Sequence, residues 1–186
     1  KMIKFLGLLS KKKKVKPATA ASIYVALLQN VISGGFIEIK DFINNNNNLD
    51  SNPNLSDADV DWFSNVIFLG NMKNLDMYFE FEEVSILRSL ILDEIYKDVD
   101  SNIRHLSIER FLDYENYYKE LLVKHETSIS AMAHAIFEKY NINNFQGDLF
   151  KKKNRPNPVF LNELKNLLSH FIWNWKDYLE KNKLRF

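Results

Sequence analysis

Apolar residues recur every three or four positions along most of the chain, which is the spacing of one buried face on an α-helix. Leu87, Leu90 and Ile91 in the middle of the chain illustrate the pattern. The clearest apolar stripe falls near the C-terminus, between Leu161 and Tyr178. The spacing predicts helices over 17–33, 36–43, 57–69, 79–99, 107–126, 128–140 and 158–178.

The ends of these helices carry their own sequence signals. Pro17 and Pro158 suit the first turn of a helix, because proline has a fixed φ and no N–H to leave unpaired. Gly34 and Gly35 favour one helix end and Gly70 another, and Ser107 and the pair Thr127-Ser128 favour helix starts. These signals separate the predicted helices from one another.

One predicted helix has an alternative. The stretch 36–43 begins with alternating apolar and polar residues, as a β-strand does. Because we find no convincing partner strand, we predict a short helix there. Asn-rich stretches at 44–54 and 141–158 are typical of exposed loops, since Asn bonds its own backbone and tolerates turns.

The pattern as a whole predicts an all-α protein. We expect a single bundle-like or orthogonal array of about six to seven helices over residues 17–186. A basic and apolar N-terminal segment, residues 1–16, precedes this domain. A chain of 186 residues is long enough to bury a core without disulfides or metal.

Composition adds three expectations. The chain has no cysteine, which excludes disulfides and thiol chemistry and fits a reducing cytoplasm. Its net charge is only +1, so any attraction for nucleic acid or lipid must be local. Gln29 and Asn30 interrupt the apolar stretch 18–35, so we predict a soluble protein.

An acidic window at 49–63 resembles a calcium loop at first sight. Asp50, Asn52 and Asn54 occupy ligand positions of that loop. However, Leu55 replaces the required glycine, and Asp61 replaces the bidentate glutamate. We therefore interpret Asp57, Asp59 and Asp61 as charges that complement the N-terminal dipole of a helix begun by Ser56, with Ser56 and Asp59 in the spacing of a helix-start capping pattern.

No pattern of catalytic residues stands out. The four histidines lack the spacing of a metal-binding helix, and no glycine-rich phosphate loop or nucleophile motif occurs. On helical geometry, His134 and His170 lie off the apolar stripes of their helices, so we expect both to be solvated. We predict a non-catalytic protein without metal or cofactor. Two alternatives stay open, namely a tertiary cluster of His125 with Glu120 and Glu126, and a helical metal-dependent enzyme.

Trp173 and Lys176 are the predicted partner-binding residues. On a continuous helix over 158–178, Trp173 lies opposite the apolar stripe and among polar residues. Tryptophan is enriched at interface hot spots, so we predict a protein-interaction module, such as an adaptor, regulator or antidote. The alternative is that another part of the same chain covers Trp173.

Two clusters of cations support a second hypothesis. Such clusters can bind the phosphates of nucleic acid or of an anionic membrane. The apolar residues before the first cluster favour the membrane, whereas the loop around the second favours nucleic acid. The clusters consist of Lys11, Lys12, Lys13, Lys14 and Lys16, and of Lys151, Lys152, Lys153 and Arg155.

Overall fold

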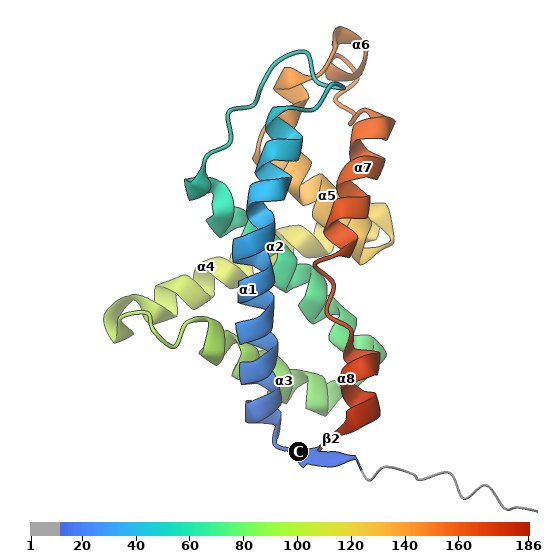
Figure 1. The fold of residues 1–186 in the computed structure, drawn as a ribbon. Coiled ribbons are helices and arrows are strands. Elements are labelled where there is room, and N and C mark those ends of the chain that lie inside the picture. The colour runs from blue at the N-terminus through green and yellow to red at the C-terminus, as the bar shows by residue number, and fades with distance from the viewer. Residues whose placement is uncertain (1–11) are drawn as a thin grey trace, which may run out of the picture.

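The computed structural model describes residues 12–186, which form an all-α array with one small sheet (Figure 1). Within this range there are eight α-helices, one more than the upper number predicted, because the first two predicted helices are joined into one, the last predicted helix is divided and a short helix lies in a loop. The helices are α1 (Pro17–Asn44), α2 (Val60–Lys73), α3 (Phe81–Ile95), α4 (Ser101–His125), α5 (Ser128–Lys139), α6 (Asp148–Lys151), α7 (Pro158–Ser169) and α8 (Trp175–Lys181). The strands are β1 (Lys13–Val15) and β2 (Asn182–Leu184).

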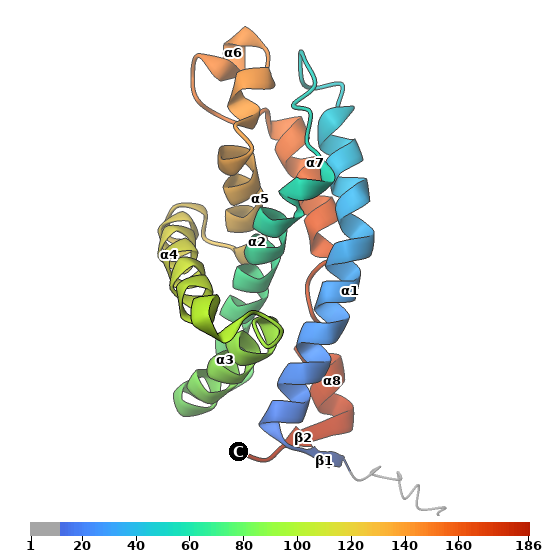
Figure 2. The same cartoon turned by 90° about the vertical axis from the view of Figure 1, so that its left-hand side faces the viewer.

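The molecule is elongated along α1, as Figures 1 and 2 show from two sides. Helix α1 packs on α2 and α3, while α5 packs on α2, α4 and α7. One connected apolar core extends from Val15 to Leu184. Helix α6 lies at one end of the molecule, and β1, β2 and the C-terminus lie at the other.

Helix α1 is longer than predicted, because Gly34 and Gly35 do not end it. The helix continues to Asn44, so the predicted break and the separate helix over 36–43 are both wrong. Phe36, Ile39 and Ile43 are fully buried and extend the same apolar face beyond the glycines. Their burial outweighs the roughly 1 kcal/mol that a glycine costs inside a helix.

The two glycines of α1 have different surroundings. A Cβ added to Gly35 would lie 2.5 Å from Cζ of Phe171, so this position must stay bare for the aromatic ring to pack. A Cβ added to Gly34 would meet nothing within 4 Å. Close packing therefore explains Gly35 and leaves Gly34 unexplained by the fold.

The predicted helix over 158–178 is broken between α7 and α8. Residues 170–174 are not helical, and the amide of Asn71 on α2 binds their backbone. Its Nδ2 donates to the carbonyl oxygen of Phe171 at 2.9 Å, and its Oδ1 accepts from the N–H of Trp173 at 2.7 Å. These bonds replace the hydrogen bonds of a continuous helix. The predicted continuous helix over 158–178 is therefore wrong, and two helices take its place.

The parallel pair of β1 and β2 was not predicted. Lys13, Lys14 and Val15 lie opposite Asn182, Lys183 and Leu184. Val15 and Leu184 are both buried, so the described part of the segment 1–16 packs with the C-terminal end of the helical array. Strands of three residues carry too little periodicity to be recognised in a sequence.

Helix starts were predicted with mixed success. Ser56 and Asp59 form the predicted capping box, and Thr127 accepts from the N–H of Ser130 at 3.2 Å to begin α5. Ser107 does not begin a helix, because α4 starts six residues earlier with Asp100 as its cap. Gly70 does not end α2, which continues to Lys73.

The adjacent glycines of α1 provide a matched test of packing. We expect Gly35→Ala to lower the free energy of unfolding by about 1–3 kcal/mol, because the new methyl displaces the Phe171 ring. Gly34→Ala should raise it by about 0.5–1 kcal/mol, because alanine favours the helix and the space is open. Chemical denaturation of both variants measures the two changes, and equal effects would contradict this account of Gly35.

Candidate functional site

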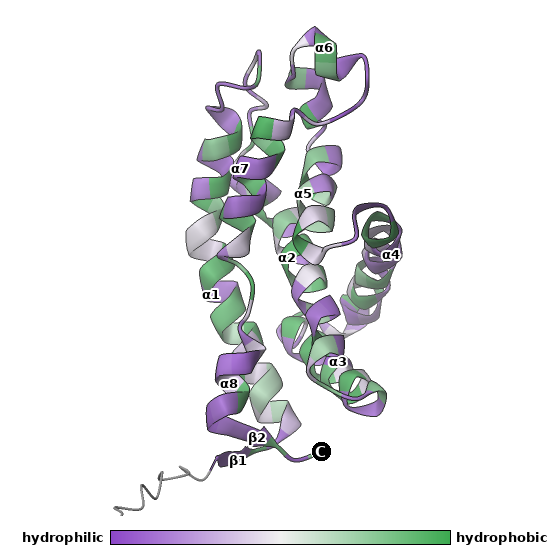
Figure 3. Cartoon of the chain, turned by 90° about the vertical axis from the view of Figure 1, so that its right-hand side faces the viewer, coloured by the Kyte–Doolittle hydropathy of each residue, from purple (hydrophilic) through white to green (hydrophobic). Residues whose placement is uncertain are grey.

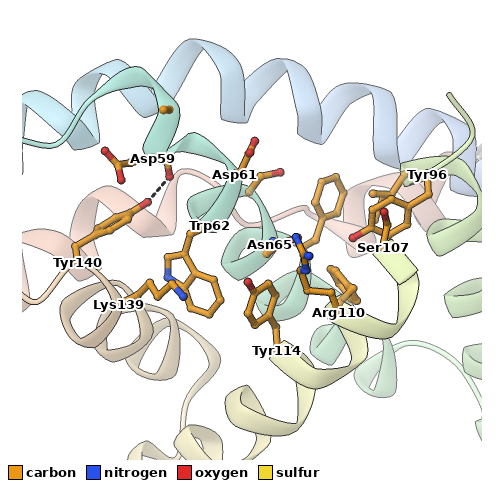
Figure 4. A pocket seen from close by; sticks show the side chains of 15 residues that line it. Asp59, Asp61, Trp62, Asn65, Tyr96, Ser107, Arg110, Tyr114, Lys139 and Tyr140 are labelled. Atoms are coloured by element: carbon orange, nitrogen blue, oxygen red, sulfur yellow. Dashed lines mark hydrogen bonds between the residues drawn. The ribbon is translucent and has the colours of Figure 1, made fainter. Parts of the chain in front are cut away.

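An open cleft of about 500 Å³ lies between α2, α4 and α5 (Figure 4). Trp62 and Tyr114 form its aromatic wall, with their ring centroids 4.6 Å apart and nearly perpendicular. The ammonium of Lys139 lies 4.9 Å from the centroid of the Trp62 ring, in cation–π contact. Asp61 lies at one side of the cleft and Arg110 toward the other.

Two phenols that border this cleft are held in the protonated form. The hydroxyl of Tyr140 donates to the backbone carbonyl of Asp59 at 2.6 Å. Burial raises the pKa of Tyr140 and of Tyr96 above the ordinary value, so both phenols stay protonated. The ammonium of Lys139 lies over both rings of the aromatic wall, 4.9 Å from the Trp62 centroid and 5.6 Å from the Tyr114 centroid.

The histidines are arranged differently from the prediction. His125 at the end of α4 stacks on His134 of α5, with ring centroids 3.4 Å apart and planes inclined by 12°. His134 was expected to be solvated, but it is half-buried between the two helices; His170 is exposed as predicted. The pair arises from the tight α4–α5 connection, which spacing within a single helix does not reveal.

Protonation of this histidine pair is disfavoured. Burial lowers the pKa of His125 first, and the neighbouring charge of His134 lowers it further. Burial also lowers the pKa of His134, whose Nδ1 donates to the carbonyl oxygen of Ser130 at 2.8 Å. The positive charges of Lys124 and Lys165 also lower the pKa of His125, while the negative charge of Glu138 raises it.

No metal centre is formed by the described side chains. Within residues 12–186, no three His, Asp or Glu residues gather closely enough to hold a metal ion. Glu120 and Glu126 therefore do not complete a cluster with His125. In the acidic window, Asp59 accepts from the backbone N–H of Ser56 at 2.7 Å, in the capping role predicted for these acids.

Trp173 faces the core rather than solvent. It is half-buried, and its ring centroid lies 5.7 Å from that of Tyr24 and 5.9 Å from those of Trp175 and Tyr178. The break after α7 turns it inward, so other parts of the same chain cover it. Lys176 is exposed on α8. A contact of these two residues with a partner stays a prediction.

The two cation clusters lie at opposite ends of the molecule (Figure 1). Lys151, Lys152, Lys153 and Arg155 surround α6, whereas Lys12, Lys13, Lys14 and Lys16 lie at the sheet; Lys11 falls outside the described residues. The sheet brings the C-terminal cations Lys181, Lys183 and Arg185 to the N-terminal ones. We call these seven exposed residues the basic tip: Lys12, Lys13, Lys14, Lys16, Lys181, Lys183 and Arg185.

A second surface extends along α1 and was not predicted. Ile23, Leu27, Val31 and Ile37 are exposed to 39, 47, 45 and 55% on the side of α1 that faces away from α2 and α3. Figure 3 shows the mainly apolar colouring of this helix. We call these four residues, together with Ala26, Asn30 and Gly34, the α1 face. The sequence signal for it was the lack of any charge between Lys16 and Glu38.

The length of α1 also bears on the membrane question. By length and composition, this 28-residue helix would suffice to cross a membrane. The core helix of a soluble protein meets the same criterion, and nine side chains of α1 are buried in the array.

No protein-family model matches the sequence, and no curated protein or solved structure is detectably similar to it.

The position of Trp173 leads to a stability test. We expect Trp173→Ala to lower the free energy of unfolding by about 2–4 kcal/mol, because it removes a large side chain packed on three aromatic rings. Lys176→Ala, on the exposed side of α8, should change it by less than about 0.5 kcal/mol. Thermal or urea unfolding compares the two, and a Trp173→Ala protein as stable as the wild type would contradict the packing described above.

The histidine pair leads to a pH test. Because both folded-state pKa values lie below the unfolded value of about 6.5, the unfolded chain binds more protons as the pH falls through that region. The pair's contribution to stability is therefore complete above about pH 7 and declines below pH 6.5. Urea unfolding between pH 7.5 and about 5.5 measures this decline. We expect His125→Asn to reduce the loss of stability as the pH falls. His170→Asn, at an exposed site, should leave that loss unchanged. An equal dependence of stability on pH in the two variants would contradict the role of the stacked pair.

Proposed function

We propose that this protein is a non-catalytic protein-interaction module whose binding surface is the α1 face. The single observation that carries this proposal is the exposed apolar ridge of Ile23, Leu27 and Val31 on a helix without charged residues between positions 16 and 38. Charged residues are depleted at the centres of protein interfaces in the same way.

Another exposed helix of the same protein makes the contrast clear. The solvent side of α4 also exposes apolar residues, but charged residues such as Glu109, Asp113 and Lys119 lie among them. Every exposed position of α1 from Ala18 to Ile37 is instead apolar, small or neutral. Single exposed apolar residues are ordinary, but an entire helix face without charge indicates contact with something other than water.

The shape of the α1 face favours a helix as its partner. Ile23, Leu27 and Val31 are spaced by four residues and form one of the ridges that fit the groove of a second helix. Gly34 follows as a bare position with open space above it, which allows the backbone of a neighbour to approach closely. The uncharged stretch spans about 30 Å, roughly six helical turns. We therefore propose an apolar helix of another protein as the occupant.

The proposal retains a cytoplasmic, non-enzymatic role. The absence of cysteine from the sequence supports a reducing compartment. Burial keeps the phenols of Tyr140 and Tyr96 protonated, so they supply no base to the cleft, which supports a non-catalytic role. Trp173 no longer supports the proposal, because packing within the chain accounts for its position.

Charge placed on the α1 face tests the proposal. We expect the double variant Leu27→Glu and Val31→Glu to keep its fold but to lose the partner, with affinity at least about 100-fold lower, since two unpaired carboxylates would be buried. The matched control makes the same two changes at Leu149 and Val159, which are exposed on α6 and α7. Quantitative affinity capture from native lysate compares the three proteins, with circular dichroism to verify folding.

Three outcomes decide the matter. A protein retained by the wild type and the control but lost by the α1 variant would support the α1 face. A partner retained equally by all three proteins would overturn it. Sedimentation equilibrium of the purified protein covers the remaining case, because self-association that the α1 variant abolishes would show that the occupant is a second copy rather than another protein.

A further inference from the structure

The parallel sheet places like charges directly beside one another at the basic tip. Lys14 of β1 is the direct neighbour of Lys183 on β2, and both side chains are exposed. Like charges opposite each other on neighbouring strands are destabilising. The sheet would be more stable with a neutral residue at either position, so the fold gives no reason for this pair.

The remaining cations of the basic tip strengthen the same field. Lys12, Lys13, Lys16, Lys181 and Arg185 flank the Lys14–Lys183 pair on the two strands and their adjoining residues. Within residues 12–186, none of the seven cations forms an ion pair. The nearest acids along the chain are Asp177 and Glu180, and Glu83 borders the cleft beside Lys12 and Lys183, so positive charge exceeds negative charge at this end.

Apolar side chains adjoin the basic tip. Lys12 and Lys183 border a cleft of about 480 Å³ together with Tyr78 and Phe186, which are exposed to 39 and 47%. In the sequence, the apolar residues of positions 2–9 come directly before the basic tip, outside the described part of the chain. Lysines next to aromatic and aliphatic side chains are typical of proteins that rest on a lipid surface, where ammonium groups meet phosphates and rings enter the headgroup layer.

We propose that the basic tip binds an anionic membrane surface. The tip lies at one end of an elongated molecule, which suits contact with a flat surface (Figure 2). Its strands span only about 10 Å, so the cations form a compact group that matches clustered headgroups. A nucleic acid strand would instead require cations spaced along an extended groove. This site is distinct from the α1 face and does not depend on the function proposed above.

Sedimentation of the full chain with lipid vesicles tests the proposal. We expect binding to phosphatidylcholine vesicles that contain phosphatidylserine, little binding to phosphatidylcholine alone, and a decline as salt rises. The variant Lys14→Gln with Lys183→Gln should partition at least about tenfold less, since each cation near such a surface contributes about 1 kcal/mol. The matched control, Lys152→Gln with Lys153→Gln, removes the same charge at the other end and should differ from the wild type by less than about twofold.

Stability gives an independent readout of the same variant. Because it relieves the like-charge pair and leaves the backbone ladder intact, the Lys14/Lys183 variant should melt at the same temperature as the wild type or slightly higher. Loss of lipid binding then has no explanation in unfolding.

Two kinds of result would contradict lipid binding by the basic tip, one from the vesicles and one from an oligonucleotide. Failure to bind phosphatidylserine vesicles, or an equal loss in the tip and control variants, would overturn the proposal. Fluorescence anisotropy with a single-stranded oligonucleotide at the same salt tests whether the basic tip binds nucleic acid instead. Tighter binding to the oligonucleotide than to vesicles, lost in the tip variant, would make the basic tip a nucleic-acid surface and the lipid proposal wrong.

Discussion

The buried amide of Asn71 is the interaction on which the C-terminal segment of the molecule, residues 170–186, depends. Its side chain is 1% exposed, and it donates to the carbonyl oxygens of Ile67 and Phe171 while accepting from the N–H of Trp173. An unpaired buried polar group would cost about 1–3 kcal/mol, so Asn71 and the non-helical segment 170–174 require each other. The break between α7 and α8 turns Trp173 inward, places the Phe171 ring over Gly35, and lets β2 reach β1 after one short helix.

Gln146 has the equivalent role at the opposite end. It is 2% exposed, its Nε2 donates to the carbonyl oxygen of Arg155 at 3.0 Å, and its Oε1 accepts from the N–H of Asn157 at 2.6 Å. The N–H of Asp50 donates to the carbonyl oxygen of Phe145 at 2.7 Å, which joins the two Asn-rich loops. Regions that look unstructured in composition are thus fixed by a few buried polar contacts, and α6 with its cations is held at that end.

Sequence patterns predicted what is local. The helical class of the fold, the capping box at Ser56 and the starts at Thr127 and Pro158 depend on neighbouring residues, so periodicity and capping rules were sufficient for them. Gly34, the α7–α8 break and the sheet depend on contacts between distant segments. Gly35 is bare because of Phe171, 136 positions further along the chain, and nothing beside either residue indicates that contact. The stacked histidines and the C-terminal half of the basic tip escaped prediction for the same reason.

The two proposed surfaces have a feature in common: each lowers the stability that the fold alone would have. An exposed Gly34 inside a helix and a Lys14–Lys183 neighbour pair both cost free energy, and neither is required by the packing beneath it. Such local violations tend to collect at functional positions, where selection acts on binding as well as on folding. The geometry also makes the surfaces compatible. Helix α1 begins at Pro17, next to Lys16 of the basic tip, and its face extends along the side of the molecule, so a chain resting on a membrane by its tip would keep the α1 face accessible to a helix from solution.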